Sequence, residues 1–89
     1  MGYPFDEESA ISEGQELDLA MLREDLIGEL QAINQYEEHI AALEDEEAIR
    51  VLEHIRDDEK EHVAELTKLT QKLDPIQAKS STRRPCNNS

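Results

Sequence analysis

Cysteine is almost absent from this sequence of 89 residues, since Cys86 is the only one. A single thiol cannot form an intramolecular disulfide, so no disulfide framework stabilises the chain, and a reducing compartment such as the cytoplasm is expected. A domain of this length buries too little surface to be comfortably stable by itself. We therefore expect oligomerisation or a bound metal to supply the missing stability.

Long apolar runs and an excess of positive charge are also missing. No stretch approaches the ~18 consecutive apolar residues that a membrane-spanning helix needs, and no segment after Met1 has the apolar length of a signal peptide. The formal net charge of −13 disfavours nucleic acid as a partner. The sequence thus predicts a soluble protein that binds neither a membrane nor nucleic acid.

Three segments of the chain differ in composition. Residues 1–11 are acidic, contain a proline and show no sustained period, which is typical of a flexible leader. Residues 12–74 show helical periodicity and predict a single domain. Residues 75–89 form a polar, basic tail, and we expect no regular structure from Gln77 onward.

Two long helices of about equal length are predicted in the middle segment. The first, over about 13–43, begins at a capping box formed by Ser12 and Gln15. The second, over about 46–73, begins after Asp45, a good N-cap residue, and ends before an Asp-Pro pair that cannot continue a helix. Because the connection is so short, the helices should fold back as an antiparallel hairpin, which gives an all-α fold.

Each predicted helix carries one stripe of core-facing positions, here called its seam. Steps along the seams alternate between three and four residues, as in helices that pack nearly parallel or antiparallel to a neighbour. The first seam contains Leu19, Leu22, Leu26, Glu29, Ile33, Tyr36, Ile40 and Leu43. The second contains Ala48, Leu52, Ile55, Glu59, His62, Leu66, Leu69 and Leu73.

Polar residues interrupt the seams at Glu29, Glu59 and His62. A buried carboxylate without a partner is costly, so such acids are usually neutralised, paired or bound to metal. No Lys or Arg lies on either seam. Glu29 and Glu59 are each 15 residues from Glu44, so they should face each other at the same height of the hairpin. His62 is one helical turn from Glu59, and both side chains can therefore reach one metal ion.

Two interpretations of this polar group remain open. In the first, His62 bonds to Glu59 without metal and sets the register of the helices, as buried polar residues do in coiled coils. In the second, the chain carries half of a ferritin-like di-iron site, in which two helices each give one Glu and two others each give Glu-x-x-His. Two hairpins packed seam to seam as a four-helix bundle would bring together four carboxylates and two imidazoles. This hard ligand set favours two iron ions, or manganese, over structural zinc.

Two stretches of the sequence resemble the encapsulated ferritins: GELQAINQY at 28–36 and RDDEKEHVA at 56–64. Together with the LDP ending at 73–75, the likeness spans about residues 19–76. The resemblance implies a two-helix half-ferritin that forms dimers and a ring of dimers, commonly a decamer. It also implies a ferroxidase centre that forms between subunits and oxidises Fe(II) with dioxygen, and a location inside an encapsulin shell that stores the iron mineral.

The resemblance further implies roles for individual residues. Glu29 would be the bridging carboxylate, and Glu59 and His62 would be terminal or chelating ligands. Tyr36 would lie near the metals, although ordinary core packing explains its seam position equally well. The basic tail is polar like an encapsulin-docking peptide but lacks the Leu- and Gly-containing core of such peptides, so a docking peptide and an inert tail both remain open.

The same residues fit two functions other than a ferroxidase. One is a non-catalytic helical scaffold that is stapled by a metal such as calcium, manganese or zinc. The other is a metal-free helical adaptor. Aerobic oxidation of Fe(II) and elemental analysis of bound metal separate the three hypotheses.

Overall fold

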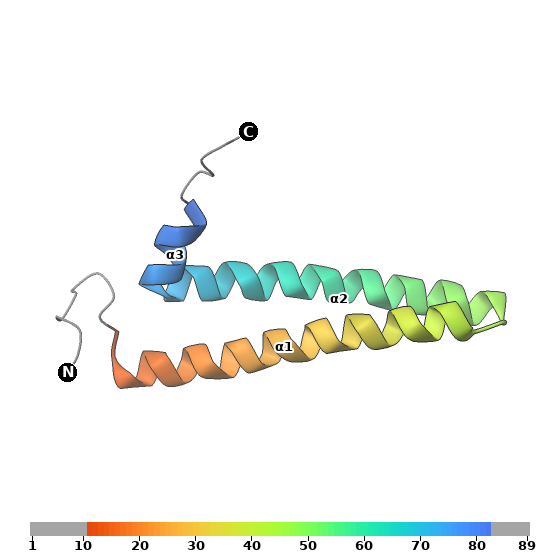
Figure 1. The fold of residues 1–89 in the computed structure, drawn as a ribbon, viewed down its shortest axis with the longest axis horizontal. Helices are drawn as coiled ribbons and strands as arrows, with labels where there is room; N and C mark the ends of the chain where they lie inside the picture. The colour runs from red at the N-terminus through yellow and green to blue at the C-terminus, as the bar shows by residue number, and fades with distance from the viewer. Residues whose placement is uncertain (1–10, 83–89) are drawn as a thin grey trace.

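The computed structural model describes residues 11–82, and all regular secondary structure in that range is helical. Helix α1 spans Glu13–Ala42, α2 spans Glu46–Leu73 and α3 spans Pro75–Thr82. The two long helices lie side by side and antiparallel, and α3 leads away from the far end of α2 (Figure 1). The predicted all-α hairpin is therefore confirmed.

Parts of the predicted leader and tail fall outside the described residues. The leader is described only at Ile11, and the last seven residues of the tail, Cys86 among them, lie beyond Thr82. Helix α1 ends at Ala42, one residue short of its predicted end. No helix within the described range is long and apolar enough to cross a membrane.

Both predicted helix caps are present. The Gln15 N–H donates to the Ser12 hydroxyl at 3.1 Å, and the Ser12 N–H donates to Gln15 Oε1 at 2.8 Å, which completes the capping box. At the start of α2, the Ala48 N–H donates to Asp45 Oδ2 at 2.9 Å. These side chains satisfy N–H groups that have no partner inside the helix, so the local sequence fixes where both helices begin.

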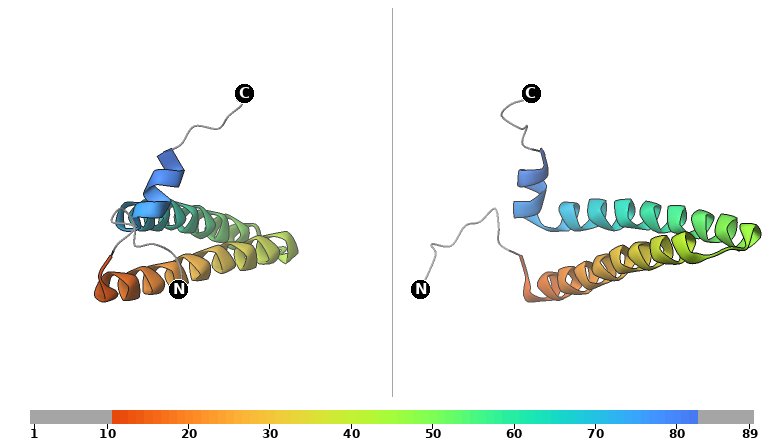
Figure 2. Two further views of the ribbon diagram at one scale, coloured as in Figure 1. Left: turned by 60° about the vertical axis from the view of Figure 1, so that its left-hand side comes forward. Right: turned by 45° about the vertical axis from the view of Figure 1, so that its right-hand side comes forward.

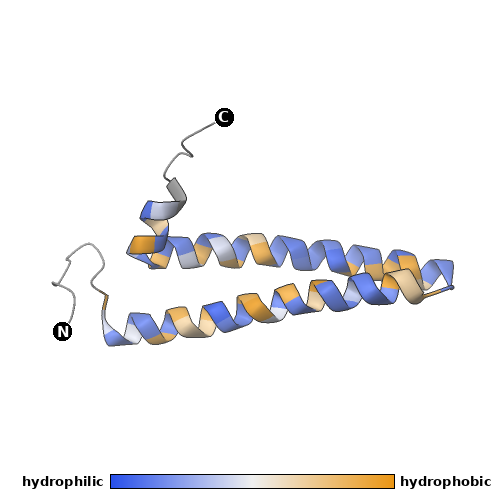
Figure 3. Ribbon diagram, in the orientation of Figure 1, coloured by the Kyte–Doolittle hydropathy of each residue, from blue (hydrophilic) through white to orange (hydrophobic). Residues whose placement is uncertain are grey.

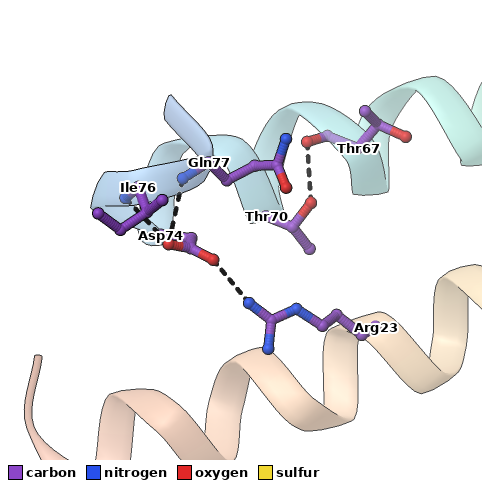
Figure 4. Close-up of polar contacts among 6 residues, drawn as sticks. All are labelled: Arg23, Thr67, Thr70, Asp74, Ile76 and Gln77. Atoms are coloured by element: carbon purple, nitrogen blue, oxygen red, sulfur yellow. Dashed lines mark hydrogen bonds and ion pairs between the residues drawn. The ribbon is translucent and has the colours of Figure 1, made fainter. Parts of the chain in front are cut away.

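Helix α3 shows that the expectation of no regular structure after Gln77 is wrong as far as Thr82. Asp74 Oδ1 accepts from the N–H groups of Ile76 at 3.1 Å and Gln77 at 3.3 Å (Figure 4). Proline at the first helical position is favourable because the N–H there would have no helical partner. The Asp-Pro pair therefore ends α2 and also begins α3.

The long helices are closest near their turn and diverge toward the open end of the hairpin, where α3 starts (Figures 1 and 2). Within residues 11–80, only Leu19 and Thr70 are buried, with 1% and 8% of their surface exposed. Most other seam residues are half-buried, and hydrophobic positions recur along both helices between hydrophilic ones (Figure 3). One hairpin therefore has no closed core of its own.

Several large apolar side chains are well exposed on this hairpin. They are Leu17, Met21, Ile27, Leu30, Val51, Leu69 and Ile76. Exposed apolar residues are normal on proteins when they are scattered, and these seven are distributed over all three helices.

Candidate metal centre

Glu29 on α1 and Glu59 and His62 on α2 meet in the middle of the hairpin, and we call them the donor group. One potential ligand atom of each lies within 4.8 Å of the others. His62 Nδ1 is 3.4 Å from Glu59 Oε1 and 3.6 Å from Glu29 Oε1. No other set of three His, Cys, Asp or Glu residues within 11–82 meets this distance.

The short turn brings the donor group together. Glu29 lies 13 residues before Ala42, the end of α1, and Glu59 lies 13 residues after Glu46, the start of α2. Residues equally far from the turn of an antiparallel hairpin lie opposite each other. His62 follows Glu59 by three residues, which places both side chains on one face of α2.

The electrostatics of the donor group suit a cation. The side chains of Glu29 and Glu59 are 27% and 19% exposed, and that of His62 is 50% exposed. In the described part of the chain, no Lys or Arg pairs with either carboxylate, and both lie close to His62. One imidazole cannot neutralise two partly buried carboxylates. Carboxylate oxygens and an imidazole nitrogen, without a thiolate, also fit the ligand preferences of iron and manganese.

A pocket of about 690 Å³ opens beside the donor group. It is lined by Glu24, Asp25, Gly28, Glu29, His62, Glu65, Leu66 and Leu69. A Cβ added at Gly28 would meet no atom within 4 Å, so this wall is open. Glu29 and His62 thus reach the pocket, whereas Glu59 lies outside its lining.

Three further acids in the pocket wall, Glu24, Asp25 and Glu65, are not among the residues predicted from the sequence. Asp25 precedes Glu29 by four residues and Glu65 follows His62 by three. Such helical spacing from the seam residues is the signal that could have found them. Clefts lined by one sign of charge raise the local concentration of counter-ions, so these walls favour the arrival of cations.

Tyr36 is half-buried on α1, seven residues after Glu29 along the same seam. It is neither part of the donor group nor of the pocket lining. Its predicted place near the metals stays a prediction, and ordinary packing remains an equally good interpretation of its position.

Basic residues near the donor group pair with other acids. Arg56 Nη1 donates to Glu37 Oε1 across the helices at 3.1 Å, and Arg56 Nε donates to Asp57 Oδ1 at 3.2 Å. Lys60 Nζ lies 3.9 Å from Glu37 Oε2. The hydrogen bond to Glu37 raises the pKa of Arg56 above its ordinary value, so this side chain stays cationic. Arg56 and Lys60 therefore do not neutralise the carboxylates of the donor group.

Comparison with known proteins agrees with the fold and the motifs. The model of the EncFtn-like family matches residues 5–79. Encapsulin nanocompartment cargo protein EncC of Myxococcus xanthus (strain DK1622) is 44% identical over 57 residues, which cover 64% of this chain and 44% of that protein. The chain therefore spans less than half the length of this curated relative.

A solved structure extends the likeness over the whole chain. The crystal structure of protein ne0167 from Nitrosomonas europaea matches with a TM-score of 0.74 and 30% sequence identity, covering 100% of this chain and 96% of that one. Family model, relative and structure agree with the resemblance seen in the sequence. The chain belongs to the EncFtn-like family, the family of the encapsulated ferritins.

Proposed function

We propose that this protein is a ferroxidase, which oxidises Fe(II) to Fe(III) with dioxygen at a di-iron site formed between two chains. The observation that carries the proposal is the convergence of the donor group within 4.8 Å. Three donors are half of the four carboxylates and two imidazoles of a ferritin-like di-iron site. A twofold axis through the pocket would supply the other half from a second copy.

The exposed seam supports this assembly. Leu69 is 39% exposed at the pocket wall and Leu66 is half-buried beside it, although both are seam residues. A second hairpin seated over the pocket would cover both leucines and bring its own donor group against the first. Burial of such apolar surface favours association by roughly 25 cal/mol per Å² before the entropic cost of binding. A ring of such dimers, as in a decamer, is proposed on the family resemblance.

The carboxylates, the imidazole and the pocket wall have different tasks in the proposed reaction. Iron is the substrate, and each Fe(II) loses one electron to dioxygen. The carboxylates of Glu29 and Glu59 bind Fe(II), neutralise its charge, and can add a second oxygen ligand as the charge rises to that of Fe(III). The imidazole of His62 supplies a neutral donor, and the acidic pocket walls concentrate Fe(II) at the site.

The compartment is proposed from the relative in Myxococcus xanthus, which is by name an encapsulin cargo protein. We extend that role to this chain: it is carried inside an encapsulin shell in the cytoplasm, where Fe(III) is stored. Co-expression with an encapsulin shell protein tests this directly. The chain should co-purify with the assembled shell, and its absence from purified shells would remove this part of the proposal.

Aerobic Fe(II) oxidation, followed by the absorbance of Fe(III), tests the ferroxidase. Glu29→Ala and His62→Ala should oxidise Fe(II) at the background rate. The matched control is Glu61→Ala, which removes one exposed acid next to His62 but no member of the donor group. It should keep the parent rate. Oxidation by His62→Ala at the parent rate would contradict the proposal.

One observation favours a second candidate function, a helical scaffold without catalysis. His62 Nδ1 already lies close to both carboxylates, so the polar group can set helix register without a metal. A metal-stapled scaffold would assemble on adding metal while Fe(II) oxidation stays at background. A metal-free adaptor would show the same mass with and without metal and would hold no metal by elemental analysis.

A further inference from the structure

Two cations flank Glu59 along α2. Arg56 precedes it by one helical turn and Lys60 follows it directly. Side chains three residues apart on a helix are neighbours, so the long side chain of Arg56 can reach Glu59, whereas adjacent residues such as Lys60 do not face it. Nevertheless, within the described residues, Glu59 pairs with neither cation, and its side chain lies close to that of His62.

Both cations are bound to one carboxylate of the opposite helix, that of Glu37. Arg56 Nη1 lies 3.1 Å from Glu37 Oε1, and Lys60 Nζ lies 3.9 Å from Glu37 Oε2. Asp57 accepts from the other side of the guanidinium, with Nη2 3.1 Å from Oδ1. The Arg56 side chain is only 20% exposed, so these acids and the helix surface confine it.

A released Arg56 would compete with iron for Glu59. An arginine that pairs with a carboxylate occupies the oxygens that a metal ion needs, and hydrogen bonds between such charged groups are among the stronger ones in proteins. A fixed positive charge within a few ångströms of a divalent cation also repels it. Glu59 is therefore available as a ligand only while Arg56 is bound elsewhere.

We propose that Glu37 is a positioning residue of the metal centre, which holds Arg56 away from Glu59 and so keeps that carboxylate free for the metal. This inference rests on the proposed function, because it concerns how Glu59 becomes available to iron. Glu37 touches neither the metal nor the donor group and acts through Arg56.

The alternative role of the Glu37–Arg56 pair is that of a simple clamp between the helices. If the pair only held the two helices together, removing either partner would weaken metal binding equally. Removing both partners would then not restore metal binding. If Glu37 restrains Arg56, the two partners differ. Loss of Glu37 then weakens metal binding, loss of Arg56 does not, and loss of both restores binding.

Binding of Mn(II) to the full chain, measured by calorimetry, is the test, since Mn(II) is a hard cation and calorimetry requires no turnover. Glu37→Gln should lower the Mn(II) affinity about tenfold, in the range seen when partners of metal ligands are removed. Arg56→Gln and the double variant Glu37→Gln/Arg56→Gln should bind Mn(II) like the parent. Circular dichroism and mass in solution confirm that each variant is helical and assembled.

The matched control is Glu38→Gln. It removes the same charge one residue further along α1, where the side chain is exposed and forms no ion pair within 11–82. It should keep the parent affinity, which separates the effect of releasing Arg56 from a general loss of negative charge.

Three results would overturn the inference. Parent-like affinity in Glu37→Gln, or a double variant as weak as Glu37→Gln, would show that Arg56 does not compete, and both leave the ferroxidase proposal intact if His62→Ala still abolishes binding. A parent chain that binds neither Mn(II) nor Fe(II) would overturn the proposed function as well.

Discussion

The open end of the hairpin and its middle are built in opposite ways. At the open end lie Leu19 and Thr70, the two residues that are buried within 11–80. Here Arg23 Nη2 also lies 2.6 Å from Asp74 Oδ2, which ties α1 to the start of α3 (Figure 4). In the middle, the seams carry the polar donor group beside an open pocket. The difference indicates that the chain is stabilised at one end, while its middle is the place where we propose that a cation and a second chain bind.

Replacing Leu19 should break this comparison most strongly. Leu19→Ala removes a side chain that is 1% exposed, and the lost burial and the remaining cavity should lower the free energy of unfolding by about 3 kcal/mol. Urea unfolding followed by circular dichroism measures the change. Leu17→Ala, at a position that is 62% exposed, should cost at most about 0.5 kcal/mol. Equal losses in the two variants would mean that the burial of Leu19 does not stabilise the open end.

Adding metal should raise the free energy of unfolding by nearly as much as Leu19→Ala lowers it. Mn(II) at about 100 times its dissociation constant should raise the free energy of unfolding by about 2.7 kcal/mol, because it binds the folded chain preferentially. A chelator should reverse the gain, and His62→Ala should abolish it. If the parent unfolds at the same urea concentration with and without Mn(II), a cation does not complete the middle.

Making the middle apolar should stabilise it without metal. Glu59→Leu replaces a carboxylate that is only 19% exposed and that faces a second carboxylate, so the metal-free chain should gain about 1.5 kcal/mol. The same variant should gain nothing from Mn(II). Unfolding in the presence of a chelator measures the gain in the metal-free chain. A variant that is less stable than the parent would show that the polar group does not destabilise the metal-free fold.

The smallest effect is expected at the junction of α2 and α3. Asp74→Ala removes both the cap of α3 and the partner of Arg23 and should cost about 1 kcal/mol. Asp74→Asn keeps a side-chain acceptor for the cap and should cost only about 0.5 kcal/mol. Hydrogen exchange of the Ile76 and Gln77 amides should be fast in the first variant and slow in the second. Fast exchange in both would show that the ion pair, not the cap, holds α3.

The donor group could be predicted from the sequence because local rules determine it. Caps at Ser12 and Asp45 set where the long helices begin, and the short turn then fixes which residues face each other. The alternating seam steps placed Glu29 and Glu59 on facing surfaces. Each of these signals acts over a few residues of sequence, so none needed knowledge of the whole fold.

Other features could not be predicted because several partners were equally plausible. The chain has 22 acidic and 9 basic residues, so periodicity does not decide that Arg56 pairs with Glu37 or that Arg23 pairs with Asp74. The start of α3 is not predicted because an Asp-Pro pair after a long helix indicates the end of that helix, and it is equally compatible with a new helix or an irregular tail. Likewise, a seam indicates that a helix packs against another element, but it does not identify which face of the hairpin a second hairpin would cover.

The placement of all three donors on one chain has a genetic consequence. In the proposed twofold arrangement, every substitution in the donor group enters each centre twice when both chains carry it, and once in a mixed pair. If parent and His62→Ala chains were made in equal amounts and paired at random, only about a quarter of the centres would keep all six donors. A defect in the donor group would therefore reduce the number of complete centres by more than its share of the chains.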